Sequence, residues 1–82
     1  MADIQIYTTR FCPFCIRAKQ LLNDKGLAFS EIPVDNDPAL RRKMAEKAGK
    51  HTVPQIWINE DHVGGCNELF AIAKLGRLDN LD

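Results

Sequence analysis

The stretch IQIYTTRFCPFCIRAKQLLNDKG, residues 4–26, decides the fold because it predicts a strand that leads directly into a helix. Residues 4–8 combine apolar and β-forming side chains in five consecutive positions, which is typical of a short strand. A helix is predicted over about residues 13–25, and Gly26 stands where a left-handed C-terminal cap would lie. The apolar residues of this helix recur at three- and four-residue spacing, at Phe14, Ala18, Leu21 and Leu22.

The rest of the chain continues the alternation of strands and helices. Asp37 is the predicted N-cap of a second helix, Pro38 its first residue and Gly49 its end. The further elements are predicted in the order strand, helix, strand, strand, helix, over residues 27–34, 38–48, 55–59, 62–64 and 67–75. The first two strands are expected to be parallel and the last two to form an antiparallel hairpin. The sequence therefore predicts an α/β fold, a four-stranded mixed sheet flanked by three helices.

Size and charge exclude several classes of protein. A chain of 82 residues is one domain, spanning residues 1–82. Eleven basic and eleven acidic side chains cancel, which gives nucleic-acid binding no electrostatic support. No segment approaches the ~20 apolar residues that cross a bilayer. The first residues carry no cationic stretch followed by a long apolar run, so we expect no secretory signal and a cytoplasmic protein. Three cysteines are too few for a disulfide framework and indicate a chemical use instead.

Cys12 is expected to be an activated thiol. Pro13 is a natural first helical residue, which places Cys12 at the N-cap. There its sulfur can accept hydrogen bonds from the backbone N–H groups of Phe14 and Cys15, and the helix dipole favours negative charge. Both effects lower the pKa of the Cys12 thiol, and each pKa unit favours the thiolate by ~1.4 kcal/mol.

Cys15 lies on the same face of the helix as Cys12, within the ~4.4–6.8 Å Cα separation that a disulfide spans. We therefore predict a redox-active Cys12–Cys15 pair, with Cys12 as the exposed nucleophile and Cys15 as the shielded resolving thiol. Two alternatives remain open. A structural zinc site needs four ligands, whereas there is no second Cys-x-x-Cys, and His51 and His62 lie eleven residues apart. The second alternative is an inert pair of core cysteines, although core residues seldom occupy an N-cap beside a proline. We expect no metal ligands.

Three landmarks together carry a family resemblance: Cys12-Pro13-Phe14-Cys15, Thr52-Val53-Pro54 and Gly64-Gly65-Cys66. In order and spacing the chain resembles a glutaredoxin of the small bacterial dithiol type, from Ile4 to about Leu78. The resemblance implies a thioredoxin fold in which Pro54 is cis and faces the active cysteines.

The same resemblance implies a glutathione site. The Val53 backbone would bind the cysteinyl part of glutathione as an added strand. The backbone at Cys66 and Asn67, where the last helix begins, would hold its γ-glutamyl end. Arg41 would pair with the glycyl carboxylate, and Lys50 is a second candidate for that pairing. The predicted glutathione-binding residues are Phe14, Arg41, Thr52, Val53, Pro54, Gly65, Cys66 and Asn67.

The sequence departs from the family pattern at several positions. Thr9 stands where a basic residue is common, with Arg10 adjacent, so charge support for the Cys12 thiolate would come from Arg10 or mainly from the helix. Phe14 replaces a common Tyr, and Asn67 and Glu68 stand where Asp is frequent. Four remaining side chains are expected to have no catalytic role. We expect Cys66 and Trp57 to be buried apolar residues, and His51 and His62 to be surface residues.

These patterns lead to one functional hypothesis, a glutathione-dependent thiol–disulfide oxidoreductase. Glutathione is the expected co-substrate, with no tightly bound cofactor. The expected partners are glutathionylated proteins and protein disulfides such as that of ribonucleotide reductase. Glutathione reductase is expected as an indirect partner, and the protein is expected to be a monomer. One alternative is a thioredoxin-like disulfide reductase, against which the Phe11-Cys12-Pro13-Phe14-Cys15 sequence speaks. The other is a non-catalytic iron–sulfur cluster carrier, in which a smaller residue is usual at Pro13.

Overall fold

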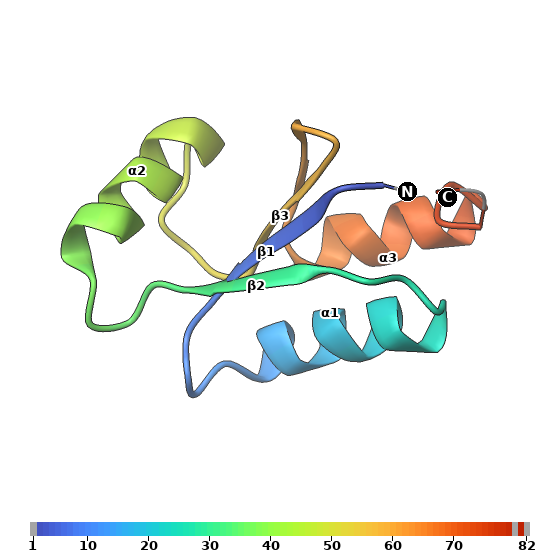
Figure 1. Cartoon of the computed structure of the whole chain (residues 1–82), viewed down its shortest axis with the longest axis horizontal. Helices are drawn as coiled ribbons and strands as arrows, with labels where there is room; N and C mark the ends of the chain where they lie inside the picture. The colour runs from blue at the N-terminus through green and yellow to red at the C-terminus, as the bar shows by residue number, and fades with distance from the viewer. Residues whose placement is uncertain (1, 80, 82) are drawn as a thin grey trace.

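The computed structural model describes residues 2–79 and 81, and its elements follow the predicted order (Figure 1). They are β1 (Ile4–Thr8), α1 (Pro13–Asp24), β2 (Ser30–Pro33), α2 (Pro38–Ala48), β3 (Gln55–Ile58), β4 (Asp61–Gly64) and α3 (Cys66–Lys74). The two ends of the described chain lie close together in Figure 1, where the Ala2 N–H donates to the Leu81 carbonyl over 3.0 Å.

The four strands form one mixed sheet in the order β2-β1-β3-β4. β1 and β2 are parallel, whereas β3 is antiparallel to both β1 and β4. The predicted parallel pair and the predicted hairpin are therefore confirmed. Asn59 and Glu60 form the hairpin turn with φ values of 51° and 72°, the positive values that a two-residue turn of this hand requires.

Helices cover both faces of the sheet. α1 and α3 lie together on one face and α2 lies on the other (Figure 1). The larger core cluster lies beneath α1 and α3 and consists of Ile4, Ile6, Ala18, Leu22, Ile56, Ile58, Cys66, Leu69 and Leu78. The smaller cluster faces α2 and consists of Tyr7, Val34, Met44 and Trp57. Residues alternate between the two clusters along β1 and β3 because successive side chains of a strand point to opposite faces.

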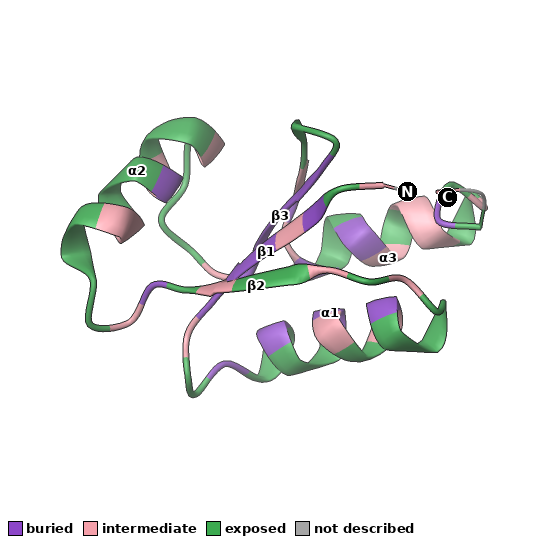
Figure 2. Ribbon diagram, viewed as in Figure 1, coloured by how far each residue is buried: buried purple, intermediate pink, exposed green. Residues whose placement is uncertain are grey.

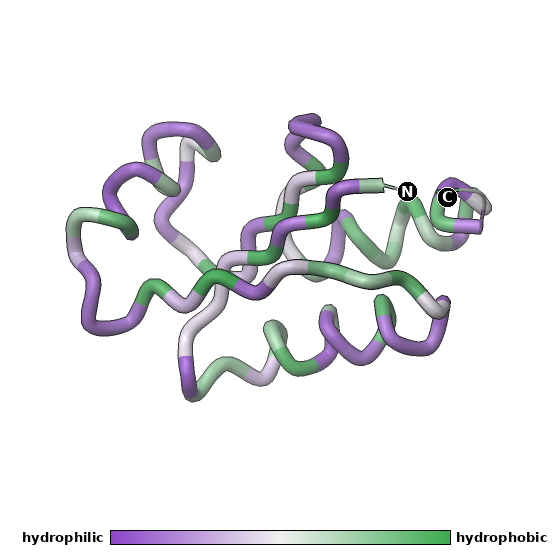
Figure 3. The backbone as a smooth tube through the Cα atoms, in the orientation of Figure 1, coloured by the Kyte–Doolittle hydropathy of each residue, from purple (hydrophilic) through white to green (hydrophobic). Residues whose placement is uncertain are grey.

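Helix α2 is held at both ends by the predicted residues. The Asp37 carboxylate accepts a hydrogen bond from the Leu40 N–H over 3.1 Å, and Gly49 closes the helix with φ 75°. Met44 is the fully buried residue of α2, which is exposed along most of its length in Figure 2 and hydrophilic along most of it in Figure 3. α2 therefore packs against the sheet through one narrow stripe of apolar side chains, as the spacing of its apolar residues predicts.

Several element boundaries differ from the prediction. β2 begins at Ser30 and not at residue 27, because Ser30 pairs with Gln5 and the parallel partner strand begins only one residue before that. β3 ends and β4 begins one residue earlier than predicted, since Ile58 and Asp61 pair across the turn. α3 begins at Cys66, one residue early, with Gly65 as its N-cap.

One prediction about helix faces was wrong. The periodicity places Phe14 on the apolar stripe of α1, but the residue is 52% exposed. The buried residues of this helix are Cys15, Ala18 and Leu22. The spacing of three and four residues holds, but it starts from Cys15, because the small sulfhydryl side chain takes the inward position at the first turn.

Candidate active site

Cys12 occupies the N-cap of α1, as predicted. Its backbone is extended, with φ −133° and ψ 99°, and Pro13 begins the helix. The Cys15 N–H donates to the Cys12 sulfur over 3.0 Å. The two residues form a disulfide across a Cα separation of 5.1 Å. The helix end therefore supplies a hydrogen-bond donor directed at the Cys12 sulfur, an arrangement that favours a thiolate over a thiol.

Both cysteines are buried. Cys12 is 7% exposed and Cys15 1%. Cys12 is therefore the less buried of the two, but it is buried and not exposed as predicted. The cover comes from Cys15, to which it is bonded, and from the segment before β3, since the Cys12 Sγ lies only 3.7 Å from the Val53 carbonyl oxygen.

The segment opposite Cys12 contains the cis peptide bond that the resemblance implied. Val53–Pro54 is cis. Pro54 is buried and Val53 half-buried, and the Val53 carbonyl faces a sulfur 41 residues away in the chain. A short length of backbone thus lies beside the Cys12 sulfur.

A groove of about 250 Å³ runs beside this segment. Its lining residues are Phe14, Lys50, Thr52, Val53, Pro54, Gly65, Cys66, Asn67 and Glu68. All the predicted glutathione-binding residues except Arg41 are among them. Three segments that are far apart in sequence therefore meet at one surface, next to the disulfide.

Of the two candidates for the glycyl carboxylate, Lys50 lines the groove and Arg41 does not. The Arg41 guanidinium donates to the His51 carbonyl over 2.9 Å and does not line the groove. Lys50 does line it, so a cation is present but comes from the loop after α2 and not from the helix. The resemblance ranks Arg41 before Lys50, and it does not reveal the contact between Arg41 and the loop because that contact depends on how the chain turns after Gly49.

The far wall of the groove is the first turn of α3. The Glu68 Oε1 accepts a hydrogen bond from the Gly65 N–H over 2.7 Å, so this acidic side chain holds the turn in place. Cys66 is 6% exposed, as its assignment as a buried residue requires. Burial raises the pKa of the Cys66 thiol, Arg17 opposes this shift and Glu68 adds to it. The thiol is therefore held in its unreactive protonated form.

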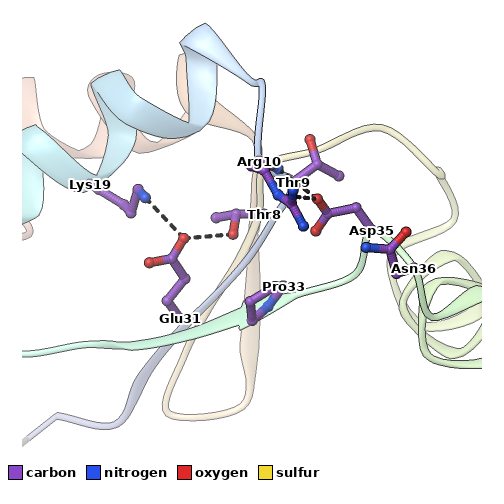
Figure 4. A pocket seen from close by; sticks show the side chains of 8 residues that line it. All are labelled: Thr8, Thr9, Arg10, Lys19, Glu31, Pro33, Asp35 and Asn36. Atoms are coloured by element: carbon purple, nitrogen blue, oxygen red, sulfur yellow. Dashed lines mark hydrogen bonds and ion pairs between the residues drawn. The ribbon is translucent and has the colours of Figure 1, made fainter.

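A second cavity, of about 420 Å³, was not predicted (Figure 4). On one side, the Thr8 hydroxyl donates to Glu31 over 2.7 Å and the Lys19 ammonium to the same carboxylate oxygen over 2.9 Å. These two hydrogen bonds hold the pKa of Glu31 below its usual value, and the bond from Lys19 has the larger effect. The signal that would have located the cavity is topological, because β1 and β2 are parallel and clefts form at the carboxyl ends of such strands.

The other side of this cavity secures the loop before the disulfide. The Asp35 carboxylate accepts from the Arg10 N–H over 3.1 Å and lies 3.8 Å from the Arg10 guanidinium (Figure 4). Arg10 therefore faces an acidic partner, which counters its charge. The helix end places the Cys15 N–H directly at the Cys12 sulfur, whereas Arg10 is paired with Asp35; which of the two sources supports the Cys12 thiolate stays a prediction.

Within residues 2–79 and 81, no three His, Cys, Asp or Glu side chains gather closely enough to bind a metal ion. Among the helices of that same part of the chain, none has the length and apolar character that crossing a membrane requires.

Comparison with known proteins gives a consistent result. Residues 4–63 match the family model described as Glutaredoxin. The chain is 58% identical over 81 residues to a glutaredoxin of Pseudomonas aeruginosa, covering 99% of this chain and 96% of the relative. It is 48% identical to glutaredoxin 3 of Escherichia coli K12, with 99% and 98% covered. The solution structure of a Brucella melitensis glutaredoxin superposes with a TM-score of 0.87 at 49% identity, covering 99% of this chain and 88% of that one.

Proposed function

Because the chain belongs to the glutaredoxin family and is a thiol–disulfide oxidoreductase with a thioredoxin fold, we propose that glutathione is its electron donor and Cys12 its nucleophile. The observation that carries the proposal is the Cys12 sulfur, which accepts the N–H of the first turn of α1 and faces the Val53 backbone across 3.7 Å. A sulfur so placed is stabilised as an anion and lies beside an extended segment that can bind a peptide-like ligand.

The proposed cycle begins with glutathione reducing the Cys12–Cys15 disulfide. The thiolate of one glutathione attacks the Cys12 sulfur, forms a mixed disulfide and releases the Cys15 thiolate. A second glutathione attacks the glutathione sulfur of that mixed disulfide, leaves as oxidised glutathione and frees the Cys12 thiolate. Two electrons pass from two glutathiones to one protein disulfide, and the sulfur valences balance at each step.

The reduced protein then acts on glutathione mixed disulfides. The Cys12 thiolate attacks the glutathione sulfur, the bond to the substrate sulfur breaks and the substrate thiolate leaves. Glutathione is held in the groove beside Cys12, with its cysteinyl backbone along Val53 and its γ-glutamyl end at Gly65, Cys66 and Asn67. Lys50, which lines that groove, is the proposed partner of the glycyl carboxylate. Arg41, which binds the His51 carbonyl, stays a candidate for the same carboxylate.

Protein disulfides take a route through both cysteines. Cys12 forms a mixed disulfide with the substrate protein, and the Cys15 thiolate attacks the Cys12 sulfur to release the reduced protein. Cys15 is 1% exposed, which restricts its attack to the sulfur beside it. Phe11 and Ile16 are 90% and 57% exposed and flank the Cys12–Cys15 pair in sequence, so a protein substrate meets apolar surface there. We propose that the substrates of this reaction are cytoplasmic protein disulfides such as that of ribonucleotide reductase. In this proposal glutathione reductase restores glutathione, and the protein acts as a monomer.

Replacing each cysteine in turn tests the proposed roles. On a glutathione mixed disulfide, Cys12→Ser should lower turnover by at least about a hundredfold, because the nucleophile is lost. Cys15→Ser should retain most of the activity on that substrate and lose it on a protein disulfide. Equal losses for the two variants on the mixed disulfide would contradict the assignment.

A further inference from the structure

Gln55 is a buried polar residue that the chemistry described above does not use. It is the first residue of β3, directly after the cis Val53–Pro54 bond, and only 2% of it is exposed. Its side-chain amide makes three hydrogen bonds. The amide nitrogen lies 3.1 Å from the Thr52 carbonyl oxygen and 3.2 Å from the Thr52 hydroxyl, and the amide oxygen lies 2.8 Å from the His62 Nε2.

Only one arrangement of hydrogens satisfies these contacts. A backbone carbonyl can only accept, so the amide nitrogen of Gln55 must face Thr52 and its oxygen must face His62. The His62 Nε2 must then carry a hydrogen and donate it. Protonation of the other ring nitrogen leaves this donor in place. The direction of the whole chain of hydrogen bonds is therefore fixed from His62 through Gln55 to Thr52.

His62 is itself held against the sheet, although it is a surface residue. Its ring lies 4.7 Å from the ring of Trp57, on the strand beside it. The Lys47 ammonium of α2 lies 5.0 Å from the same indole ring. Trp57 is 4% exposed and provides a rigid support. The donor that orients Gln55 is therefore anchored to the core by stacking.

The other end of the same segment is fastened from a different element. The Arg41 guanidinium of α2 binds the carbonyl of His51, the residue before Thr52. The carbonyls of His51 and Thr52, directly before Val53, are thus each held by one side chain. This is the backbone whose Val53 carbonyl faces the Cys12 sulfur and whose edge borders the groove.

We infer that Gln55, oriented by His62, is a positioning residue that holds the Thr52–Val53 backbone in the geometry that binds the peptide part of glutathione. The inference rests on the proposed function. Without the amide, the Thr52 carbonyl and hydroxyl lose their partner and turn toward other donors, and the neighbouring Val53 groups turn with them. Binding suffers, whereas the Cys12 sulfur keeps its own donor, which belongs to α1.

The test compares kinetic constants for the wild type and two variants on a glutathione mixed disulfide. Gln55→Met keeps the length and volume of the side chain but removes all three hydrogen bonds. Gln55→Glu keeps its shape and places an oxygen against the Thr52 carbonyl. Gln5→Met is the matched control, because Gln5 lies on the neighbouring strand and pairs with Trp57.

Both Gln55 variants should raise KM about tenfold, the change expected from losing hydrogen bonds that hold a binding segment. Their kcat and the pH at which Cys12 becomes alkylatable should stay at wild-type values, and Gln5→Met should change nothing. A merely structural role gives the opposite pattern, a lower kcat from a smaller folded fraction with KM unchanged. A KM within twofold of the wild type in Gln55→Met would overturn the inference.

His62→Phe provides a second test that does not disturb the core. It keeps a ring against Trp57 and removes the donor to Gln55, so KM should rise about two- to threefold. In the Gln55→Met background it should have no further effect, because the two residues act through one another. Additive effects would refute the proposed order of action. Failure of the proposed function itself looks different, since the wild type would then show no saturable activity with a glutathione mixed disulfide.

Discussion

Gly64→Ala should destabilise the protein through one identifiable contact. Gly64 ends β4 with φ 121°, a backbone conformation that an L side chain rarely adopts. A β-carbon at this position would lie 2.8 Å from both the Cγ and the Oε1 of Glu68. Glu68 would have to move, and its movement would break the 2.7 Å hydrogen bond that it accepts from the Gly65 N–H.

The expected cost has two parts. The unfavourable backbone conformation costs about 1–2 kcal/mol. Losing the hydrogen bond to the Glu68 carboxylate costs about 1.5–2 kcal/mol more, since a charged acceptor is involved. Gly49→Ala is the matched control because Gly49 has φ 75° and nothing lies within 4 Å of a β-carbon there. The control carries a backbone cost without the contact with Glu68, and its φ lies closer to the left-handed helical region, so Gly64→Ala should be the less stable of the two by at least about 2 kcal/mol.

Urea unfolding followed through the single tryptophan measures this difference. Trp57 is 4% exposed and should report the loss of the core. With a slope of about 1 kcal/mol per molar urea for a small domain, the midpoint of Gly64→Ala should lie about 2 M below that of Gly49→Ala. KM for the glutathione mixed disulfide should rise in Gly64→Ala alone, because Gly65 and Glu68 line the groove. Equal midpoints and equal KM values for the two variants would refute the reasoning.

Three further predictions concern single side chains. Hydrogen bonds from Lys19, and then from Thr8, lower the pKa of Glu31 in the folded protein. The contribution of Glu31 to stability is therefore complete above its unfolded pKa, near 4.5, and is lost as the pH falls through the lower folded pKa. The difference in urea midpoint between the wild type and Glu31→Gln should be constant above about pH 5 and shrink toward acid pH. Cys66, with its raised pKa, should react with iodoacetamide more slowly than a free peptide thiol at pH 8 when the other two cysteines are replaced by serine, and labelling at the free-peptide rate, measured by mass spectrometry, would contradict its burial. Asp37→Ala removes the cap of α2 and should cost about 1 kcal/mol in urea unfolding, and an unchanged midpoint would show that the cap is not needed.

The features predicted correctly from sequence are those with a local cause. Asp37, Pro38 and Gly49 mark the ends of α2 by chemistry that acts within one helical turn, and Pro13 places Cys12 at the N-cap in the same way. The order of elements followed from such local signals and from the periodicity of apolar residues. The resemblance added Val53–Pro54, whose cis bond no spacing of residues could reveal.

The features that sequence missed depend on partners far along the chain. The length of β2 is set by where β1 begins, and Phe14 is excluded from the buried stripe of α1 because Cys15 already fills the inward position of the first turn. Lys50 and Arg41 were both named as candidates, but only the path of the loop determines which of them reaches the groove. The Gln55 network requires a strand register that brings a residue of β4 beside it.

The register of the sheet explains why three separate landmarks form one site. β1 and β3 are antiparallel with Tyr7 opposite Gln55, so the end of β1, which leads to Cys12, lies beside the start of β3, which follows Pro54. β3 and β4 are antiparallel with Ile56 opposite Gly64, which brings the start of α3 to the same edge. A shift of one residue between β1 and β3 would turn Trp57 toward the wrong face and carry Val53 away from the Cys12 sulfur. The apolar alternation that builds the two core clusters therefore also fixes the distance between the nucleophile and the backbone that binds its substrate.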